Sequence, residues 1–534
     1  MARTTERPFL PDLLPRAWDF VIAGRPLLAL TTVWLTTAGH TMNFRELGIA
    51  QGWVTAELFS LQTCLLFSIA LTLLACPAWG QRFPCRGLTQ VGLALLAIGS
   101  LLNGTYLHAP LSVFLAGRAI AGVGSGLVIY FAPRLLDPRW GTATAWAAII
   151  LPTAGPGVIS AASMFQGVSD WEWGFLFEGA FALFCLVLLL FQADRRESPP
   201  PAPQGSLAYL PCLVLGSAAL LYCLHWGQLH GWLESFDIVI AAALGTFALT
   251  LALVLGWPRL DLVALKENWI RLLLFFYGGL CQFFHGYTMN VYGGLLINFS
   301  TWQRSLLIWW LPLGIATGLS LAQLVRRRWN LTLDLPGTIA GLLILAFGLY
   351  LSHQRTIDWP FWQTLNQVDL NWFQAPQQWE LAPSRFLMGM GIGLLMIAMD
   401  NMVSPDPERE EKIRPFLVVA QFFGGGIAAG LFVNWLMIGH QIQYSYSADR
   451  DYIQAEEMAD RRTLLRNELA QAGSPAPDYA AEVLQYRAVN YEADNQVFAD
   501  IYGKFIVASV SLAGLCLGLL AWKRLRSPPE PGAS

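Results

Sequence analysis

The sequence predicts an all-α integral membrane protein with fourteen membrane-spanning helices. Hydrophobic residues make up 55% of its 534 residues and charged residues only 13%, whereas soluble proteins carry about 25% charged residues. Apolar stretches long enough to cross a bilayer recur along the whole chain, and Lys and Arg gather in alternate loops between them. A net charge of −3 gives no reason to expect a nucleic-acid partner.

The predicted spans follow from length, because an α-helix needs about 20 apolar residues to cross the hydrocarbon core. Fourteen stretches meet this requirement: 26–47, 52–76, 88–107, 111–133, 141–164, 173–192, 207–226, 236–257, 268–292, 303–325, 336–353, 386–404, 415–438 and 500–522. Loops after even-numbered spans carry clusters such as Arg195–Arg196 and Arg326–Arg328, while outer loops such as 103–110 lack Lys and Arg. This positive-inside pattern predicts an inner (plasma) membrane protein with both termini in the cytoplasm.

Three motifs recur in the same order in the two halves of the chain. Gly39–Asn43 returns as Gly286–Asn290, and Arg118 with its following glycines returns at Arg385. The third motif, Gly155-Pro156-Gly157, returns as Gly424-Gly425-Gly426. The repeat predicts two six-helix bundles, with two further helices inserted between them and a substrate site near the midplane.

These patterns divide the chain into consecutive parts. We expect a cytoplasmic N-terminus (1–25), an N-terminal bundle (26–193), a cytoplasmic linker (194–206), two inserted transmembrane helices (207–257), a C-terminal bundle (268–522) and a cytoplasmic tail (523–534). Within the C-terminal bundle, the charged stretch 440–495 is interrupted by Gly473-Ser474-Pro475 and predicts a helical hairpin on the periplasmic side. The Trp-rich stretch 354–384 is expected on the outer membrane face.

Arg118 is a permanent charge inside an apolar span. Its insertion costs roughly 2.5–3.5 kcal/mol, so a buried arginine marks a functional pathway by default. Gly122 and Gly126 share its helical stripe, and small residues four apart allow a neighbouring helix to come close. Arg385 is either an interfacial anchor near the membrane edge or, as the repeat suggests, a deeper counterpart of Arg118.

Proton coupling needs a group that gains and loses a proton during the cycle. The candidates are Glu57, Glu178 and His40, with Arg118 as the fixed cation beside one of them. Glu57 is either a proton switch or a static neutraliser of Arg118, and His40 is either titrating or structural. Asn43, Asn290 and Tyr287 are candidates for lining the substrate cavity. Gly155, Pro156 and Gly157 are interpreted as a packing and bending device.

These residues resemble the major facilitator superfamily, in particular its fourteen-helix drug/proton antiporter branch with the Emr-type multidrug exporters. The resemblance rests on Gln51–Ala56, Arg118-x-x-x-Gly122-x-Gly124, Ala154–Gly157, Asp170–Phe175 and Trp226–Trp232. The chain departs from the family pattern: Gln81 stands for an Asp in the loop after the second span, and Ala38 for an acidic residue. The sequence therefore resembles that of a divergent member of this branch.

The resemblance implies a proton-coupled exporter of amphipathic drugs or other small organic compounds that works by alternating access, with a periplasmic adaptor protein as a further partner. The alternatives are a dedicated metabolite or siderophore exporter and a non-transporting membrane scaffold. An enzyme is not expected, because the sequence has no nucleophile–base arrangement, phosphate-binding loop or metal-ligand spacing. Neither a cofactor nor a metal ion is expected.

Overall fold

The structure is a computed structural model and describes residues 25–33, 35–37, 44–105, 109–135, 171–190, 208–256, 262–293, 301–329, 334–357, 378–402, 406–453 and 455–526. Over these ranges the regular structure is helical and contains no strand. Ten of the helices described are long and apolar enough to cross a membrane. The predicted all-α class is confirmed.

Residues 25–33 and 35–37 are helical, in agreement with the first predicted span. The helices that follow are α2 (Phe44–Gln51), α3 (Thr55–Gly80), α4 (Cys85–Thr105), α5 (Leu111–Phe131), α7 (Glu172–Leu190), α8 (Tyr209–Trp226), α9 (Phe236–Gly256) and α10 (Leu262–Glu267). The second half contains α11 (Trp269–Val291), α12 (Thr301–Trp329), α13 (Leu335–Ile357), α15 (Gln378–Asn401), α16 (Pro407–Ile453), α17 (Ala455–Gln471) and α18 (Pro477–Arg526).

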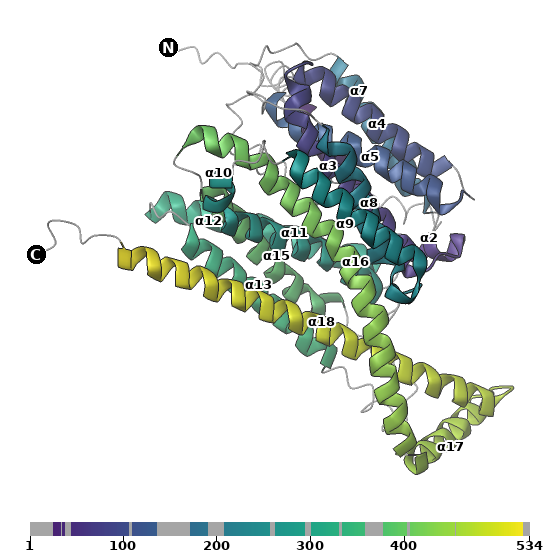
Figure 1. The fold of residues 1–534 in the computed structure, drawn as a ribbon. Coiled ribbons are helices and arrows are strands. Elements are labelled where there is room, and N and C mark those ends of the chain that lie inside the picture. The colour runs from purple at the N-terminus through teal and green to yellow at the C-terminus, as the bar shows by residue number, and fades with distance from the viewer. Residues whose placement is uncertain are drawn as a thin grey trace, which may run out of the picture.

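Two groups of helices pack side by side (Figure 1). In the first group α3, α4, α5 and α7 contact one another, and in the second α11, α12, α13, α15, α16 and α18 do so. Helices α8 and α9 form a pair, and α8 lies against α3 and α16, which also contact each other. The α3–α16 contact therefore joins the two groups, and α8 adjoins that contact.

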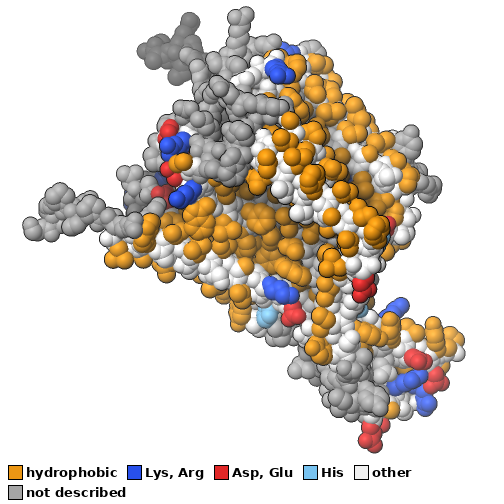
Figure 2. Space-filling model, viewed as in Figure 1, with side chains coloured by type: hydrophobic (Ala, Val, Ile, Leu, Met, Phe, Trp, Pro, Cys, Tyr) orange, Lys and Arg blue, Asp and Glu red, His pale blue; other side chains and the backbone are white. Residues whose placement is uncertain are grey.

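The flank of the molecule is apolar, as expected of a surface that faces lipid. Figure 2 shows hydrophobic side chains over most of the visible flank, while charged side chains gather near the projecting α17 and at the opposite end. On α9, for example, Leu244, Phe247 and Val254 are exposed. Such a surface would be an aggregation site in water, but in a bilayer it is matched by lipid chains.

Helices α16 and α18 extend far beyond the length that a bilayer requires. They contain 47 and 50 residues, which at about 1.5 Å per residue gives roughly 70 Å, against a hydrocarbon core of about 30 Å. Their ends and α17 project from the molecule together (Figure 1). The predicted 415–438 span does not end a helix, because α16 continues to Ile453. The break predicted at Gly473 is present, with a positive φ of 81°.

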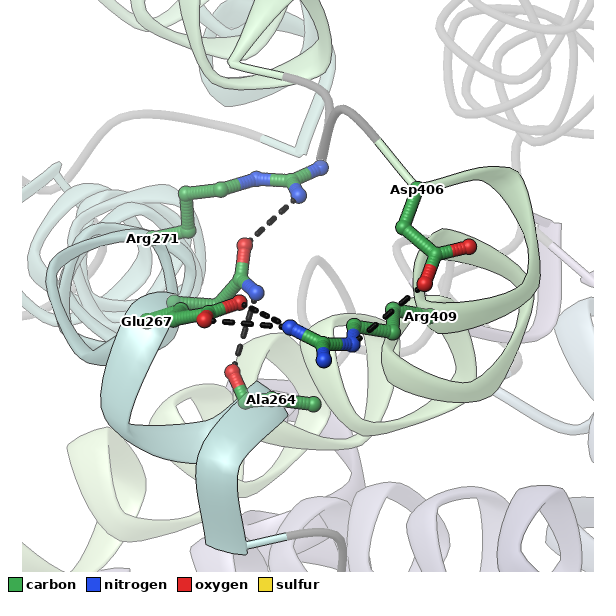
Figure 3. A network of polar contacts seen from close by, with 6 residues as sticks. Ala264, Glu267, Arg271, Asp406 and Arg409 are labelled. Carbon is green, nitrogen blue, oxygen red and sulfur yellow. Dashed lines mark hydrogen bonds and ion pairs between the residues drawn. The ribbon is translucent and has the colours of Figure 1, made fainter.

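A network of charged side chains ties α10 and the start of α11 to the start of α16, at the end that the charge pattern assigns to the cytoplasm (Figure 3). The buried Arg271 donates from both terminal nitrogens to the Glu410 carboxylate, at 2.7 and 2.9 Å. Arg409 binds Glu267 at 3.1 Å and Asp406 at 3.4 Å. The network therefore joins α10 and α11 to α16 at this end.

Candidate functional site

Arg118 lies in the interior of the first group of helices and is only 1% exposed. Its Nη2 atom donates to the Thr36 carbonyl oxygen at 3.0 Å and to Gln62 Oε1 at 3.3 Å. Both acceptors are neutral, and they come from the first predicted span and from α3. The Nη1 atom has no hydrogen-bond partner among the residues described.

Gln62 is fixed in one orientation by its two neighbours. Its Nε2 atom donates to the Thr37 carbonyl oxygen at 2.7 Å, while its Oε1 atom accepts from Arg118. Because an amide nitrogen only donates and an amide oxygen only accepts, these partners assign the two ends of the side chain. Gln62 thereby presents an acceptor to the guanidinium without adding a second charge.

Glu178, on α7, is the acid that the structure places near Arg118. It is 1% exposed, and the Ser100 hydroxyl of α4 donates to its Oε2 atom at 3.3 Å. Phe175 lies one helical turn earlier on the same face of α7, and its ring centre is 5.8 Å from Arg118 Cζ. A buried cation and a buried acid thus share one interior.

Glu57 is placed elsewhere. Because α3 begins at Thr55, Glu57 lies in its first turn. The Val54 backbone N–H donates to its Oε2 atom at 3.0 Å, so the carboxylate caps the helix. The expected approach of Glu57 to Arg118 is therefore not found in this structure. The negative charge also suits the positive end of the helix dipole.

The two glycines on the Arg118 stripe lie where α5 packs closely on α3. A Cβ atom at Gly122 would be 2.6 Å from the Leu65 carbonyl oxygen and from Ser68 Cβ, and one at Gly126 would be 2.7 Å from Thr72 Cβ. Side chains at these positions would push the two helices apart. The small residues therefore let α3 and α5 hold Gln62 and Arg118 at hydrogen-bonding distance.

Tyr287 lies at the contact between the two groups of helices. It is fully buried, and its ring is 4.9 Å from that of Phe59 on α3, measured between centres. Asn290 is on the same helix, α11, but its side chain is not among those described. The other site residues predicted from the sequence, His40, Asn43, Gly155, Pro156 and Gly157, fall outside the described residues.

Arg385, the repeat counterpart of Arg118, is buried in the second group with 0% exposure. Its Nη2 atom donates to the Tyr502 hydroxyl of α18 at 3.1 Å. Arg385 is therefore enclosed by the second group of helices, which favours the deeper of the two positions that the sequence leaves open. The predicted span begins at residue 386, whereas α15 begins at Gln378.

Sequence reasoning missed several polar residues of the interior. Gln62, Thr63, Ser100 and His225 are all buried and hydrogen-bonded. The available signal was the presence of polar residues within apolar spans, but that signal does not say which of them meet. In the described part of the chain, no group of three or more His, Cys, Asp or Glu side chains is placed to hold a metal ion.

Membrane-length helices in two packed groups, with buried charges in the interior of each, define a multi-pass membrane protein of the transporter class. Residues 28–365 match the family described as Major Facilitator Superfamily, and the chain belongs to this family. Its membership indicates a transporter rather than an enzyme. No curated protein matches the chain in sequence.

Several solved structures share the fold. A POT family transporter in complex with a thioalcohol-conjugated peptide is 14% identical, with a TM-score of 0.59 over 93% of this chain and 96% of that one. A bacterial homologue of the human lysosomal transporter Spinster, inward-facing and occupied, is 12% identical, with a TM-score of 0.55 over 93% and 96%. Tetrameric PepTSo2 is 14% identical, with a TM-score of 0.54 over 95% and 99%. At these identities the likeness concerns the fold alone.

Proposed function

We propose that the protein is a proton-coupled exporter of amphipathic organic compounds in the inner membrane, and a divergent member of the fourteen-helix drug/proton antiporter branch. The observation that carries the proposal is the buried acid Glu178, which lies one turn after the Phe175 ring that contacts the buried cation Arg118. A helix that served only as a membrane anchor would need neither. Intramembrane ionisable groups are costly and by default functional.

In this mechanism Glu178 carries the proton and Arg118 controls its release. A carboxyl group in an apolar interior holds its proton, and a guanidinium that comes close stabilises the ionised form. Arg118 Nη1 is without a partner among the residues described, so it can donate a hydrogen bond to the Glu178 carboxylate when α5 and α7 shift. The proton then leaves toward the cytoplasm, because proton entry is coupled to export of the substrate.

The substrate is proposed to bind between the two groups of helices, lined by Asn43, Asn290 and Tyr287. The position of Tyr287, packed on Phe59 of the opposite group, supports this assignment. Aromatic rings suit flat apolar compounds, and the amides supply hydrogen bonds. Arg118, in the interior of the first group of helices, remains a fixed charge that the substrate need not contact.

The test is proton-driven transport by the purified protein in proteoliposomes, with Glu178→Gln as the central variant. Glutamine keeps the size of the side chain and its acceptor for Ser100 but cannot release a proton. We expect at least a tenfold loss of gradient-driven transport, with substrate exchange at equal pH retained. Glu57→Gln is the matched control and should transport normally, because glutamine also caps α3. Normal gradient-driven transport by Glu178→Gln would exclude the proposed proton site.

A dedicated metabolite or siderophore exporter is the second proposal, supported by the departures of the sequence from the drug-exporter pattern at Ala38 and Gln81. The two proposals differ in substrate range. A multidrug exporter should release a proton on addition of several unrelated amphipathic compounds, whereas a dedicated exporter should respond to one chemical class. A non-transporting scaffold would release none and would make both proposals wrong.

We also propose that the projecting part of the chain binds a periplasmic adaptor protein. The ends of α16 and α18, with α17 between them, extend well beyond a bilayer thickness. Exposed apolar side chains occur on this projection, among them Tyr446, Leu464 and Tyr479. A projection of this kind suits the handing of substrate to a partner across the periplasm.

A further inference from the structure

The inserted helix α8 meets α3 and α16 at a single buried hydroxyl group. The Thr63 Oγ1 atom of α3 is 2.8 Å from His225 Nε2 of α8 and 3.0 Å from the Gly426 carbonyl oxygen of α16. Thr63 is fully buried and His225 is 1% exposed. One side chain from each of α3 and α8 and one backbone group of α16 thus share a buried hydrogen-bonded node.

The direction of these hydrogen bonds follows from the proton count. A hydroxyl group has one proton to donate, and the Gly426 carbonyl oxygen can only accept it. The imidazole must therefore donate its Nε2 proton to the lone pair of Thr63 Oγ1. The Thr63 hydroxyl thus accepts from the imidazole and donates to the carbonyl oxygen. Loss of the hydroxyl removes both bonds and takes the Thr63 acceptor away from the imidazole N–H.

A second set of contacts binds α8 directly to α16. Asn434 Nδ2 donates to the Leu224 carbonyl oxygen at 2.6 Å, one residue before His225. One turn before Asn434, a Cβ atom at Gly430 would be 2.8 Å from Leu224 Cβ. The absence of a side chain at Gly430 therefore leaves room for Leu224. The outer end of α8 is therefore bonded to both helices that join the two groups.

The node lies along a contact that must change in an alternating-access cycle. Phe59 contacts Phe432 in the outer part of the membrane-spanning stretches of α3 and α16, with 5.4 Å between ring centres. Phe67 stacks on Phe423 further in, at 4.8 Å. The two helices thus run antiparallel in direct contact. Opening the outer side requires them to separate there, which the bonds of Thr63 to Gly426 and of α8 to both helices oppose.

We propose that the α8–α9 pair is a latch on the outer side of the transporter, and that the His225–Thr63–Gly426 node holds this side closed. The latch rests on the alternating-access transport proposed above. It gives the two inserted helices a role of their own: α8 bridges the helices that must part, and α9 supports α8 from the lipid side. Breaking the node favours the outward-open state.

The experiment measures the distance between the outer end of α3 and the point where α16 leaves its predicted membrane span, by double electron–electron resonance on the full chain in nanodiscs. Spin labels are attached to unnatural amino acids at Val54 and Ile442, because the chain has eight native cysteines. Both positions are 48% exposed. Val54 directly precedes α3, and Ile442 lies on α16 just beyond the predicted span 415–438. In Thr63→Val we expect the fraction of molecules with the longer distance to rise at least threefold over the otherwise native chain.

Thr72→Val is the matched control. Thr72 is also on α3, but its hydroxyl donates to the Ser68 carbonyl oxygen of its own helix at 2.8 Å, so its loss breaks no bond between helix groups. Asn434→Leu, which removes the second bond to α8, serves where Thr63→Val fails to fold, and should shift the distances in the same direction. Unchanged distances in the folded node variant, or equal shifts in Thr72→Val, overturn the latch.

The distance measurement needs neither substrate nor a proton gradient, so it separates the latch from the transport proposal. A shifted distance in a protein that does not couple protons would leave the latch in place and reject the proton site. Normal proton coupling with unshifted distances would keep the proton site and reject the latch.

Discussion

At the scale of single residues, the packing of the interior depends on glycines at the helix contacts as much as on the polar side chains. Gly122 faces the Leu65 carbonyl oxygen so closely that even a methyl group would be 2.6 Å from it. Alanine normally favours a helix over glycine by about 1 kcal/mol. At Gly122 this gain is set against overpacking of a helix contact, which costs about 1–3 kcal/mol.

We therefore expect Gly122→Ala to lower the thermal unfolding midpoint in detergent, and to weaken transport by moving Gln62 away from Arg118. Gly518→Ala is the control, because no atom lies within 4 Å of the position where its Cβ would be. Gly518→Ala should be neutral or slightly stabilising. If both variants show the same midpoint, the close approach of α3 and α5 is not required for stability.

The residue scale also shows why the candidate site was only partly predictable. Arg118 was identifiable because a charge in an apolar span is conspicuous at any register. The choice between Glu57 and Glu178 was not, because it depends on where α3 begins: a start at Thr55 places Glu57 at the helix end, where its carboxylate binds a backbone N–H. His225 gave no local signal, since its partner Thr63 is 162 residues away in the sequence.

At the scale of helices, the charge network at the start of α16 contains one buried ion pair, Arg271–Glu410, beside the exposed pair Arg409–Glu267, of which Figure 3 shows the exposed one. Arg271 is 3% exposed and forms two hydrogen bonds with Glu410. Removing one partner of a buried pair costs about 3–5 kcal/mol, because the other charge stays in a poorly solvated place. An exposed pair contributes only about 0–1 kcal/mol.

Arg271→Ala is therefore expected to destabilise the packing of α11 on α16 strongly, while Arg409→Ala, which removes the exposed pair with Glu267, should have little effect. Chemical unfolding in mild detergent, followed by tryptophan fluorescence, compares the two. The midpoint of Arg271→Ala should move clearly and that of Arg409→Ala should stay within error. Equal effects would assign the network to surface electrostatics.

Helix ends were the part of the fold that hydropathy predicted least well. The apolar stretch of α16 ends near residue 438, yet the helix continues to Ile453, because backbone hydrogen bonds propagate through polar residues as readily as through apolar ones. Hydropathy marks the part of a helix that lies in lipid and not the helix itself. The turn at Gly473 was predictable, since its positive φ is a conformation that glycine adopts at little cost.

At the scale of the whole molecule, the same continuity of α16 and α18 makes the projection separable from the membrane part. The two helices stay paired where they leave the bundle: His440 Nδ1 is 2.7 Å from the Asp494 carboxylate, and the rings of Tyr444 and Tyr486 lie 6.4 Å apart, centre to centre. The stretch of α16 just after Tyr444 and the stretch of α18 just before Tyr486 are therefore close enough to be joined by a short linker.

Replacing residues 448–484 with a short Gly/Ser linker should remove the projecting tip and keep the His440–Asp494 pair. Because the two groups of helices and their contact through α3 and α16 lie outside this region, the shortened protein should fold and transport in proteoliposomes at the native rate. In intact cells, where an adaptor would have to dock, export should fall to background. Loss of transport in both settings would assign the projection to the transport cycle itself, and normal export in cells would exclude the adaptor.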